Sequence, residues 1–491
     1  MDSTQASGAN TAQAFEAQLQ DWIKLEKAAV QLIAHMSHLW YDMSVELLMF
    51  RNQMIDRSVS EIINLHHYAK TFVKKPITVY ESVEVASEMA KMDLAPSRID
   101  IGKLTSEWVL EKANYASCKE FVADKLKNFI GKDKRVMVPK DVVLYGFGRI
   151  GRILARELIV QAGKGEQLRL RAIVTRDKSD ADIIKRADLL RSDSVHGPFP
   201  GTVIEDLPNK ALIINGHVVH MISAKQPEDI DYTIYGINDA LVIDNTGILR
   251  DRVELSRHLV SKGVGKVLLT APAAGDVPNI VYGVNQSMCA ENENIFSAAS
   301  CTTNAIVPVL SVMDKMMGID KGHIETIHSY TNDQNLLDNY HKKYRRGRSA
   351  PLNMVITETG ADKAVSKAIP HLAGKITGNA VRVPTPNVSL AILNLTLNKV
   401  TNKDEINNAL LNAALEGELV EQIQYSSNNE LVSSDLVGCP ASSIVDSPAT
   451  IVSKDGKSAV LYVWYDNEYG YSRQCVRFSK YIAHVIRLTY Y

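Results

Sequence analysis

The chain has 491 residues, enough for two to four domains, and its 45% hydrophobic and 23% charged residues are typical of a globular protein. Its formal net charge of -1 excludes the strong charge imbalance that indicates a nucleic-acid or membrane-surface partner. Because no apolar run approaches the ~20 residues that cross a bilayer, and the polar start of the chain lacks a signal-peptide pattern, we expect a cytoplasmic protein.

Residues 1–139 are expected to form an all-α extension. Apolar residues recur there at spacings of three and four, as on one stripe of a long amphipathic helix that is close to a heptad seam. The stripe consists of Leu25, Ala29, Leu32, Met36, Leu39, Met43, Leu47, Phe50 and Met54. Such a helix either packs inside a small bundle, which is the more common case, or pairs with a partner or another subunit. A further helical pattern spans 106–130, and Pro76 and Pro96 mark breaks between helices.

After a short charged linker over residues 132–140, strands alternate with helices, which indicates a parallel α/β sheet. The expected strands are 142–145, 170–174, 240–243 and 266–269, and the expected helices are 150–161 and 252–261. Beyond residue 301 longer strands, 389–397 and 459–464, mix with a helix over 403–415, which indicates an α+β domain over 301–491. A last helix, about 471–488, is expected to pack back on the α/β domain.

A glycine-rich turn follows the first of these strands and opens a helix. It consists of Gly146, Phe147, Gly148, Arg149, Ile150 and Gly151. The first glycine permits a tight turn, the second lets the backbone approach a pyrophosphate, and the third allows the helix to pack closely on the strand. The N–H groups at the start of the helix then face the phosphates. The motif predicts a Rossmann dinucleotide-binding domain over residues 140–300.

An acidic residue at the end of the second strand is expected to bind the adenosine ribose of the dinucleotide. Asp177 lies there, somewhat farther along the chain than the usual ~20 residues, and a surface loop over 163–166 accounts for the excess. Its neighbour Arg176 either faces solvent, which we favour, or meets the 2′-phosphate of NADP. The expected cofactor is therefore NAD, with NADP left open.

Five cysteines are scattered along the chain without a Cys-x-x-Cys pair, so we expect neither disulfides nor a metal site. Cys301 differs from the other four because small polar residues surround it and an apolar helical run, 305–317, follows. A cysteine at a helix N-terminus is favoured as the thiolate, which is the nucleophilic form. His328 follows a probable strand over 323–327 and is the candidate base.

Several segments, taken together and in this order, resemble the phosphorylating glyceraldehyde-3-phosphate dehydrogenase family. They are Ser300-Cys301-Thr302-Thr303-Asn304, Arg345-Arg346-Gly347-Arg348, Thr359-Gly360, residues 381–389 and residues 464–472. The resemblance covers the chain from about Val142 to the C-terminus, whereas residues 1–139 are not part of the family's usual core. It implies oxidation of D-glyceraldehyde 3-phosphate to 1,3-bisphosphoglycerate through a hemithioacetal and a thioester on the cysteine, in a homotetramer.

The resemblance also implies a role for individual residues. Cys301 would be the nucleophile and His328 its base. The residues implied to bind substrate and inorganic phosphate are Ser300, Thr302, Thr331, Thr359, Gly360 and Arg382. Those implied to bind the dinucleotide, besides the glycine-rich turn, are Asp177, Thr270 and Asn467, with Thr246 and Gly247 in the turn beside the nicotinamide.

Two departures from the family pattern stand out. Ala305 occupies the position where the family often has a second cysteine, and Arg176 the position where it usually has asparagine. One alternative is erythrose-4-phosphate dehydrogenase, a close relative that tends to lose the phosphate-binding threonines; this chain keeps Thr331 and Thr359, which favours the triose phosphate. Another alternative is a protein that keeps the active site but uses its helical extension to bind a partner.

Overall fold

The computed structural model describes residues 3–71, 73–131 and 134–491, so positions 132 and 133 of the expected linker lie outside the described residues. The chain divides into two compact units. The N-terminal unit comprises Met1–Met137 together with Ile486–Tyr491, and the larger unit comprises Val138–Val485. Among the described residues, every helix is too short or too polar to cross a membrane.

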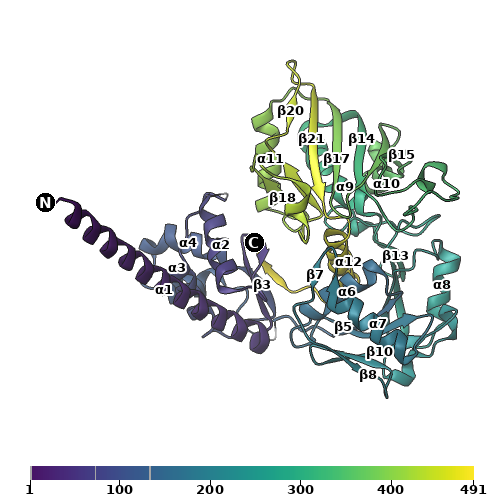
Figure 1. The fold of residues 1–491 in the computed structure, drawn as a ribbon, viewed down its shortest axis with the longest axis horizontal. Helices are drawn as coiled ribbons and strands as arrows, with labels where there is room; N and C mark the ends of the chain where they lie inside the picture. The colour runs from purple at the N-terminus through teal and green to yellow at the C-terminus, as the bar shows by residue number, and fades with distance from the viewer. Residues whose placement is uncertain (1–2, 72, 132–133) are drawn as a thin grey trace. The chain divides into compact units, whose positions relative to one another are not determined.

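The N-terminal unit packs helices around a small sheet (Figure 1). The helices are α1 (Ser3–Met43), α2 (Val59–Thr71), α3 (Val79–Met89), α4 (Ile101–Glu111) and α5 (Cys118–Lys125). The strands are β1 (Val45–Met49), β2 (Asn52–Gln53), β3 (Ser97–Asp100) and β22 (Leu488–Tyr490), in the spatial order β2-β1-β3-β22. This unit has its own apolar core, which extends from Ala28 to Phe129 along the chain.

The expectation of an all-α extension is wrong, because this sheet lies among its helices. The apolar stripe was expected to continue along one helix to Met54, but α1 ends at Met43 and Ser44 takes a left-handed backbone with φ of 59°. Strand β1 follows and is buried on both faces, so its residues are apolar without alternation. A short run of that kind cannot be told from a buried helical segment by periodicity alone.

The helix expected over 106–130 is also interrupted. It forms α4 and α5, and Ser117 caps the start of α5 by accepting a hydrogen bond from the Glu120 N–H. A serine in this position favours a new helix start over continuation of the preceding helix.

The last residues of the chain complete the sheet of the N-terminal unit. Strand β22 pairs in parallel with β3, with Leu488 opposite Ser97. Just before it, the buried Arg487 contacts the buried Glu46 carboxylate at 3.5 Å, and Arg98 contacts the same carboxylate at 3.0 Å. The helix expected to run to about residue 488 therefore ends earlier, because the chain leaves it to form this strand.

The first sheet of the larger unit has the strand order β13-β12-β11-β4-β5-β10-β9-β8. The strands are β4 (Lys140–Tyr145), β5 (Leu168–Thr175), β8 (Val203–Asp206), β9 (Ala211–Ile214), β10 (His217–Ser223), β11 (Ala240–Asp244), β12 (Val264–Leu269) and β13 (Ile295–Ser297). The accompanying helices are α6 (Arg149–Val160), α7 (Asp180–Arg191) and α8 (Arg252–Val260), and β6 (Ser192–Asp193) pairs with β7 (Gly197–Pro198). The six strands β4, β5 and β10 to β13 are parallel, and the chain order reverses between β4 and β11, which is the Rossmann arrangement.

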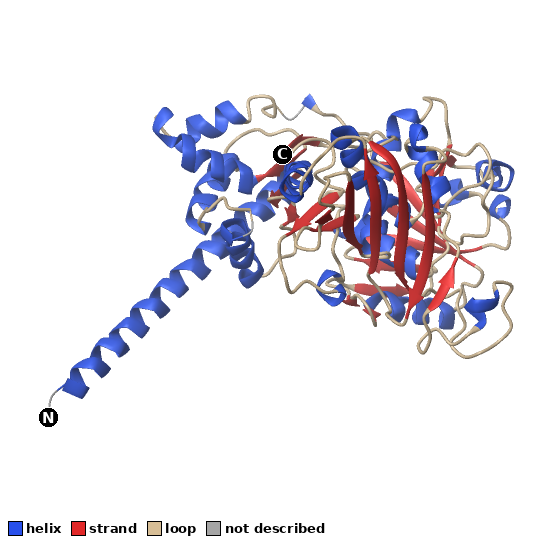
Figure 2. Cartoon of the chain, turned by 90° about the horizontal axis from the view of Figure 1, so that it is seen from above, coloured by secondary structure: helices blue, strands red, loops and turns tan. Residues whose placement is uncertain are grey.

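The second sheet of the larger unit has long strands that lie side by side (Figure 2). Its strands are β14 (Ile319–Ser329), β15 (Val355–Thr357), β16 (Ile376–Val383), β17 (Ser389–Leu397), β18 (Ile423–Ser426), β19 (Ser443–Asp446), β20 (Ile451–Val452) and β21 (Ser458–Tyr465). The helices are α9 (Cys301–Met317), α10 (Ala361–Ala368), α11 (Lys403–Leu415) and α12 (Tyr469–Ile482). Helix α12 binds α6 of the Rossmann sheet through a buried ion pair between Arg473 and Glu157 at 2.6 Å.

The ion pair at the C-terminal strand gives a test of this architecture. Arg487→Ala leaves the buried Glu46 carboxylate with one of these two arginines. We therefore expect the free energy of unfolding of the N-terminal unit to fall by about 1–3 kcal/mol. Hydrogen exchange followed by mass spectrometry would show faster exchange in β1 and β3 only. Thr489→Ala, which changes an exposed side chain of the same strand, is the control. Unchanged exchange in the Arg487 variant would contradict the role given to the pair.

Candidate active site

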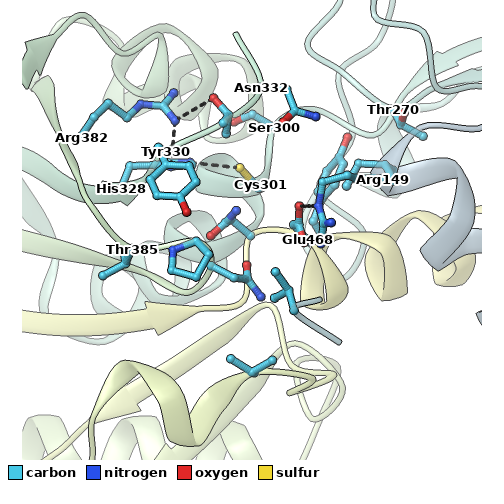
Figure 3. Close-up of a pocket in the computed structure, with 18 of the residues that line it drawn as sticks. Arg149, Thr270, Ser300, Cys301, His328, Tyr330, Asn332, Arg382, Thr385 and Glu468 are labelled. Carbon is cyan, nitrogen blue, oxygen red and sulfur yellow. Dashed lines mark hydrogen bonds and ion pairs between the residues drawn. The ribbon is translucent and has the colours of Figure 1, made fainter. Parts of the chain in front are cut away.

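One cavity of about 950 Å³ in the larger unit brings together residues from both of its sheets (Figure 3). Of the residues expected from the sequence, nine line this cavity. They are Arg149, Ile150, Thr270, Ser300, Cys301, His328, Thr331, Arg382 and Asn467. The cavity therefore joins the expected nucleophile, its expected base and part of the expected dinucleotide site.

Cys301 is the first residue of α9, and its thiol lies half-buried at the cavity wall. Ser300 caps the helix, and its hydroxyl accepts a hydrogen bond from the Thr303 N–H at 3.0 Å. The preceding Ala299 has a φ of 54°, a left-handed conformation that is costly for alanine. The Tyr471 hydroxyl donates to the Ala299 carbonyl at 2.8 Å and helps to hold this turn. The strained turn thus fixes where the thiol points.

The His328 ring lies across the cavity wall from the thiol, with Nε2 at 3.6 Å from the Cys301 Sγ. Its Nδ1 lies 2.7 Å from the Ser329 carbonyl oxygen and 3.1 Å from Nη1 of Arg382. Arg382 Nη1 also has two acceptors, the Ser329 carbonyl at 3.0 Å and the Thr331 hydroxyl at 3.2 Å. We assign the proton to Nδ1, which then donates to the Ser329 carbonyl while Arg382 Nη1 donates to the Thr331 hydroxyl. Nε2 then offers its lone pair to the thiol.

Burial disfavours charge on both members of this pair. Desolvation raises the pKa of the Cys301 thiol, although the Arg382 charge and hydrogen bonds from Thr302 act in the opposite direction. Desolvation, and then the Arg382 charge, lower the pKa of His328 to about 3. The imidazole is therefore neutral at neutral pH, with a lone pair on one ring nitrogen. The helix N-terminus was expected to favour the thiolate, and burial of the thiol works against that effect.

Arg382 places a guanidinium beside the thiol and the imidazole. It lies on β16 directly opposite His328 of the parallel neighbour β14, and it donates to the Thr331 hydroxyl that also lines the cavity. A half-buried guanidinium with neighbouring hydroxyls is a site suited to a phosphate or another oxyanion. Figure 3 shows the Arg382 head group on the same side of the cavity as Cys301 and His328.

Three residues expected near the phosphates are not in the cavity lining. Thr302 is buried, and its hydroxyl is 2.9 Å from the Tyr465 hydroxyl. Thr359 and Gly360 precede α10, where the Thr359 hydroxyl accepts a hydrogen bond from the Ala361 N–H at 3.3 Å.

The glycine-rich turn has the geometry that its sequence predicts. Gly146 has a φ of 99°, a conformation that disfavours any side chain. A Cβ on Gly151 would lie 2.5 Å from the Gly146 carbonyl oxygen, so the helix packs directly on the turn. A Cβ on Gly148 would meet nothing within 4 Å. Open space at that glycine, next to the helix start and between β4 and β11, leaves room for a pyrophosphate.

The remaining expected dinucleotide residues stand at the ends of parallel strands. Asp177 follows β5 and accepts hydrogen bonds at 2.9 Å from both the backbone and the hydroxyl of Ser179. Thr246 follows β11 and donates its hydroxyl to Asp244 at 2.6 Å, and the next residue, Gly247, has a φ of 64°. Carboxyl ends of parallel strands at a change of chain order are the usual place for a nucleotide.

Sequence reasoning missed the charges that surround Arg149. Its guanidinium binds the Glu468 carboxylate and reaches Asp193 at 3.1 Å, while His196 contacts Glu468 at 3.0 Å. Glu468 lies beside Asn467 in a segment that the sequence singled out, but its partner is more than three hundred positions away. No local pattern indicates such a pairing. The cavity wall formed by Asn387 and its neighbours was missed for the same reason.

A Rossmann sheet whose switch point opens on a buried cysteine–histidine pair defines the class of this protein as an NAD-dependent dehydrogenase. Comparison with protein families agrees. Residues 140–252 match the model of the glyceraldehyde 3-phosphate dehydrogenase NAD-binding domain, and residues 300–467 match that of the C-terminal domain. The chain belongs to the glyceraldehyde-3-phosphate dehydrogenase family.

The relatives differ in how much of the chain they match. A "glyceraldehyde-3-phosphate dehydrogenase-like protein" of Pseudomonas aeruginosa is 50% identical over 435 residues, which is 88% of this chain and 94% of the relative. The glyceraldehyde-3-phosphate dehydrogenase of Priestia megaterium is 41% identical over 339 residues, 69% of this chain and 96% of the relative. Glyceraldehyde-3-phosphate dehydrogenase 1 of Bacillus subtilis is 40% identical over 343 residues, 70% of this chain and 98% of the relative. The first of these matches is longer than the larger unit, so it extends into the N-terminal unit.

Two glycines of the turn give a matched test of NAD binding. Gly148→Ala adds a methyl group in open space, so we expect it to change the free energy of unfolding by at most about 1 kcal/mol while weakening NAD binding roughly tenfold. Gly151→Ala forces the helix off the turn and should cost about 1–3 kcal/mol of stability as well as affinity. Thermal unfolding and calorimetric NAD titration of both variants would check this. Unchanged NAD affinity in the Gly148 variant would contradict the placement of the pyrophosphate.

Proposed function

We propose that this protein catalyses the phosphorylating oxidation of D-glyceraldehyde 3-phosphate to 1,3-bisphosphoglycerate with NAD(P). The observation that carries the proposal is the contact of 3.6 Å between Cys301 Sγ and His328 Nε2 beside Arg382. A thiol, a neutral base and a fixed cation are the groups that thioester formation and phosphate binding require.

The proposed reaction begins when the Cys301 sulfur adds to the aldehyde carbon while the thiol proton passes to His328 Nε2, which leaves an oxyanion on the former carbonyl oxygen. His328 returns this proton to the oxyanion, which gives the hemithioacetal and a neutral imidazole. Bound NAD supplies the hydride acceptor. As the C1 hydrogen leaves as hydride, His328 accepts the hydroxyl proton of the hemithioacetal, and a thioester forms. Inorganic phosphate then attacks the thioester carbonyl, the carbon–sulfur bond breaks, and the thiolate and the acyl phosphate separate. The cavity keeps these groups in place during both halves of the reaction.

Two anions have to be bound, the substrate phosphate and the attacking phosphate. We assign Arg382, Thr331 and Ser300 to them because these side chains line the cavity beside the thiol. Thr302, Thr359 and Gly360 are kept in this role on the family resemblance.

For the dinucleotide, we assign the turn from Gly146 to Gly151, including Phe147, Arg149 and Ile150, with Asp177 at the adenosine ribose and Asn467 at the nicotinamide end. Thr246, Gly247 and Thr270 complete this site. The unfilled space at Gly148 and the closeness of Gly151 to the turn support the assignment. NADP remains a second acceptor in the proposal, since Arg176 adjoins Asp177. The domains that carry the two halves are proposed to be 140–300 and 301–485, because the parallel sheet ends at Ser297 and α9 begins at Cys301. The catalytic domain was expected to run to residue 491, but residues 486–491 belong to the N-terminal unit.

Steady-state kinetics with both cofactors test the proposed reaction. Cys301→Ser is expected to abolish turnover and to leave NAD affinity unchanged, because the nucleophile does not hold the dinucleotide. His328→Asn should lower kcat roughly 10²–10⁴-fold, the usual contribution of a positioned base. Wild-type protein that reduced neither NAD nor NADP with glyceraldehyde 3-phosphate and phosphate would exclude the proposal. Higher kcat/KM with erythrose 4-phosphate would support the alternative substrate.

We further propose a homotetramer, as the resemblance implies, in a reducing compartment such as the cytoplasm. Support for self-association comes from a loop whose large apolar side chains are exposed in the single chain. They are Leu336, Leu337, Tyr340, Tyr344, Leu352, Met354 and Ile356. An apolar group of this kind is typical of a surface that another subunit covers. The compartment is supported by five cysteines that are all free.

A second role, in assembly, is favoured by the first half of α1. Figure 1 shows this half extending away from the other helices of the N-terminal unit. The apolar stripe continues along it, with Phe15, Leu19 and Trp22 exposed by 64%, 41% and 45%. The first half of α1 lies beyond the part of the helix that contacts α2 and α3. A helix without such contacts is only marginally stable in water. We propose that α1 of a second copy covers this part of the stripe.

The choice of a second copy rests on continuity and charge. From Leu25 onward the same stripe packs within the N-terminal unit, so the exposed part has the spacing of a helix-packing face. Glu16, Asp21 and Lys24 give this half of α1 mixed charge, without the basic excess that favours an anionic membrane.

Two measurements on the full chain test assembly. Sedimentation equilibrium should give the mass of a tetramer, and a monomer mass would exclude it. If α1 pairs with α1, backbone amides from residue 14 to 26 should exchange slowly, and Leu19→Ser with Trp22→Ser should make them exchange fast without changing turnover. Gln20→Ser, an exposed change outside the stripe, should behave like wild type. Fast exchange of these amides in wild-type protein would contradict the pairing.

A further inference from the structure

One wall of the active-site cavity has no part in the proposed mechanism. It is formed by the turn between β16 and β17 and by the segment before β19. Its lining residues are Thr385, Pro386, Asn387, Ser433, Ser434 and Val437, all of them uncharged. The charged groups of the cavity, Arg149, Arg250, Arg382 and Glu468, belong to the other walls. Figure 3 shows Thr385 on this wall, apart from Arg382 and Arg149.

Asn387 is the unusual residue of this wall. Its side chain is only 4% exposed, yet it lines the cavity. Within the described part of the chain, neither its amide oxygen nor its amide nitrogen has a hydrogen-bond partner. Buried amide groups are nearly always paired, so both atoms call for a partner that enters the cavity.

The turn that carries Asn387 is held in a strained conformation. The next residue, Val388, has a φ of 65°, which a β-branched residue rarely adopts. Its carbonyl accepts a hydrogen bond from the Ser329 hydroxyl at 2.9 Å, and its side chain packs with Leu436, Ala441 and Ile444. A strained backbone of this kind persists only where the surrounding structure holds it in place, and such residues are frequent at binding and catalytic sites. The unpaired amide is therefore presented by a rigid support.

The same turn is hydrogen-bonded to two segments of the proposed site, one next to the base His328 and one that contains Asn467. Ser329, next to the base His328, donates to Val388 as described, and Ser389 donates its hydroxyl to the Asn467 amide oxygen at 2.9 Å. With its oxygen occupied in this way, Asn467 has its N–H groups left to offer, whereas Asn387 offers a donor and an acceptor. The two asparagines therefore present different hydrogen-bonding groups to the cavity.

We propose that Asn387 binds an uncharged ligand group that both donates and accepts a hydrogen bond. This inference rests on the proposed function. A phosphate does not fit, because it is an anion and this wall has no cation to bind it. Two groups in the proposed reaction have the required chemistry. One is the carboxamide of the nicotinamide ring, and the other is the C2 hydroxyl of the triose phosphate.

The test compares wild type with Asn387→Ala using one analogue for each group. The 3-acetylpyridine analogue of NAD keeps the carbonyl but lacks the amide N–H. 3-Phosphopropanal, the aldehyde without the C2 hydroxyl, serves as the other analogue. Wild type should prefer the natural compound over one analogue roughly tenfold or more in kcat/KM, since a site built to bind a group rejects ligands that lack it. Asn387→Ala should lose that preference, and the analogue concerned identifies the group.

Matched variants separate binding from packing. Asn407→Ala changes another asparagine with an unpartnered buried amide oxygen, which lies on α11 outside the cavity lining, and should keep the wild-type preferences. Asn387→Leu keeps the side-chain volume and replaces the alanine variant if that variant fails to fold. Equal preferences in wild type and in the Asn387 variants, with both analogues, would overturn the inference.

Failure of the proposed function is distinguishable from failure of this inference. If wild-type protein does not turn over glyceraldehyde 3-phosphate, the proposed function fails. The carboxamide arm is then measured as the equilibrium affinity of the chain for NAD against its acetylpyridine analogue. If turnover is normal but Asn387 does not affect either preference, only the inference fails.

Discussion

A thiol and an imidazole meet at 3.6 Å in this protein, both in surroundings that disfavour charge. The site therefore depends on the half-buried cation Arg382, whose position opposite His328 is set by the register of β16 on β14 rather than by its neighbours in the sequence. Its Nη1 donates a hydrogen bond to the Ser329 carbonyl, which also accepts the hydrogen bond assigned to His328 Nδ1. By engaging that carbonyl and the Thr331 hydroxyl, the guanidinium helps to fix which ring nitrogen faces the thiol.

At the glycine-rich turn the constraint is different, because there the backbone of the helix packs directly on the backbone of the turn. Helix α6 begins where the turn after β4 ends. A Cβ atom on Gly151 would lie 2.5 Å from the Gly146 carbonyl oxygen, so no side chain fits there. Arg149 begins that helix, and its guanidinium binds Glu468, the residue before α12. Glu157 and Arg473 join the same two helices farther along. The glycine-rich turn and the segment containing Asn467 are thus held by two ion pairs that join α6 to α12 and the residue before it.

The sequence predicts those features that depend on local pattern. The strand over 389–397 and the helix over 403–415 match β17 and α11 to the residue, because one alternates on a half-buried sheet and the other has a cap at Asn402. Strand β1 was missed because its apolar residues continue the spacing of the helix before it. Strand β22 was missed because its partner, β3, lies near the other end of the chain. In the site, Cys301 and the glycine-rich turn can be predicted from the residues next to them in the sequence. Glu468 and Asn387 cannot, because the residues that surround them in the fold are distant in the sequence.

The N-terminal unit is more than an appendage at the start of the chain, because the chain's last residues are part of it. The larger unit is therefore connected to it at both ends, through residue 138 before β4 and through residue 485 after α12. One connection leads into β4, which precedes the glycine-rich turn, and the other follows α12, the helix that begins at the cavity. Loss of β22 from its sheet would expose the β3 edge and leave Glu46 with fewer partners, so the N-terminal unit needs the end of the dehydrogenase chain to complete its fold. The Pseudomonas aeruginosa relative matches 435 residues of the chain, more than the larger unit contains, so part of the N-terminal unit is matched together with the dehydrogenase.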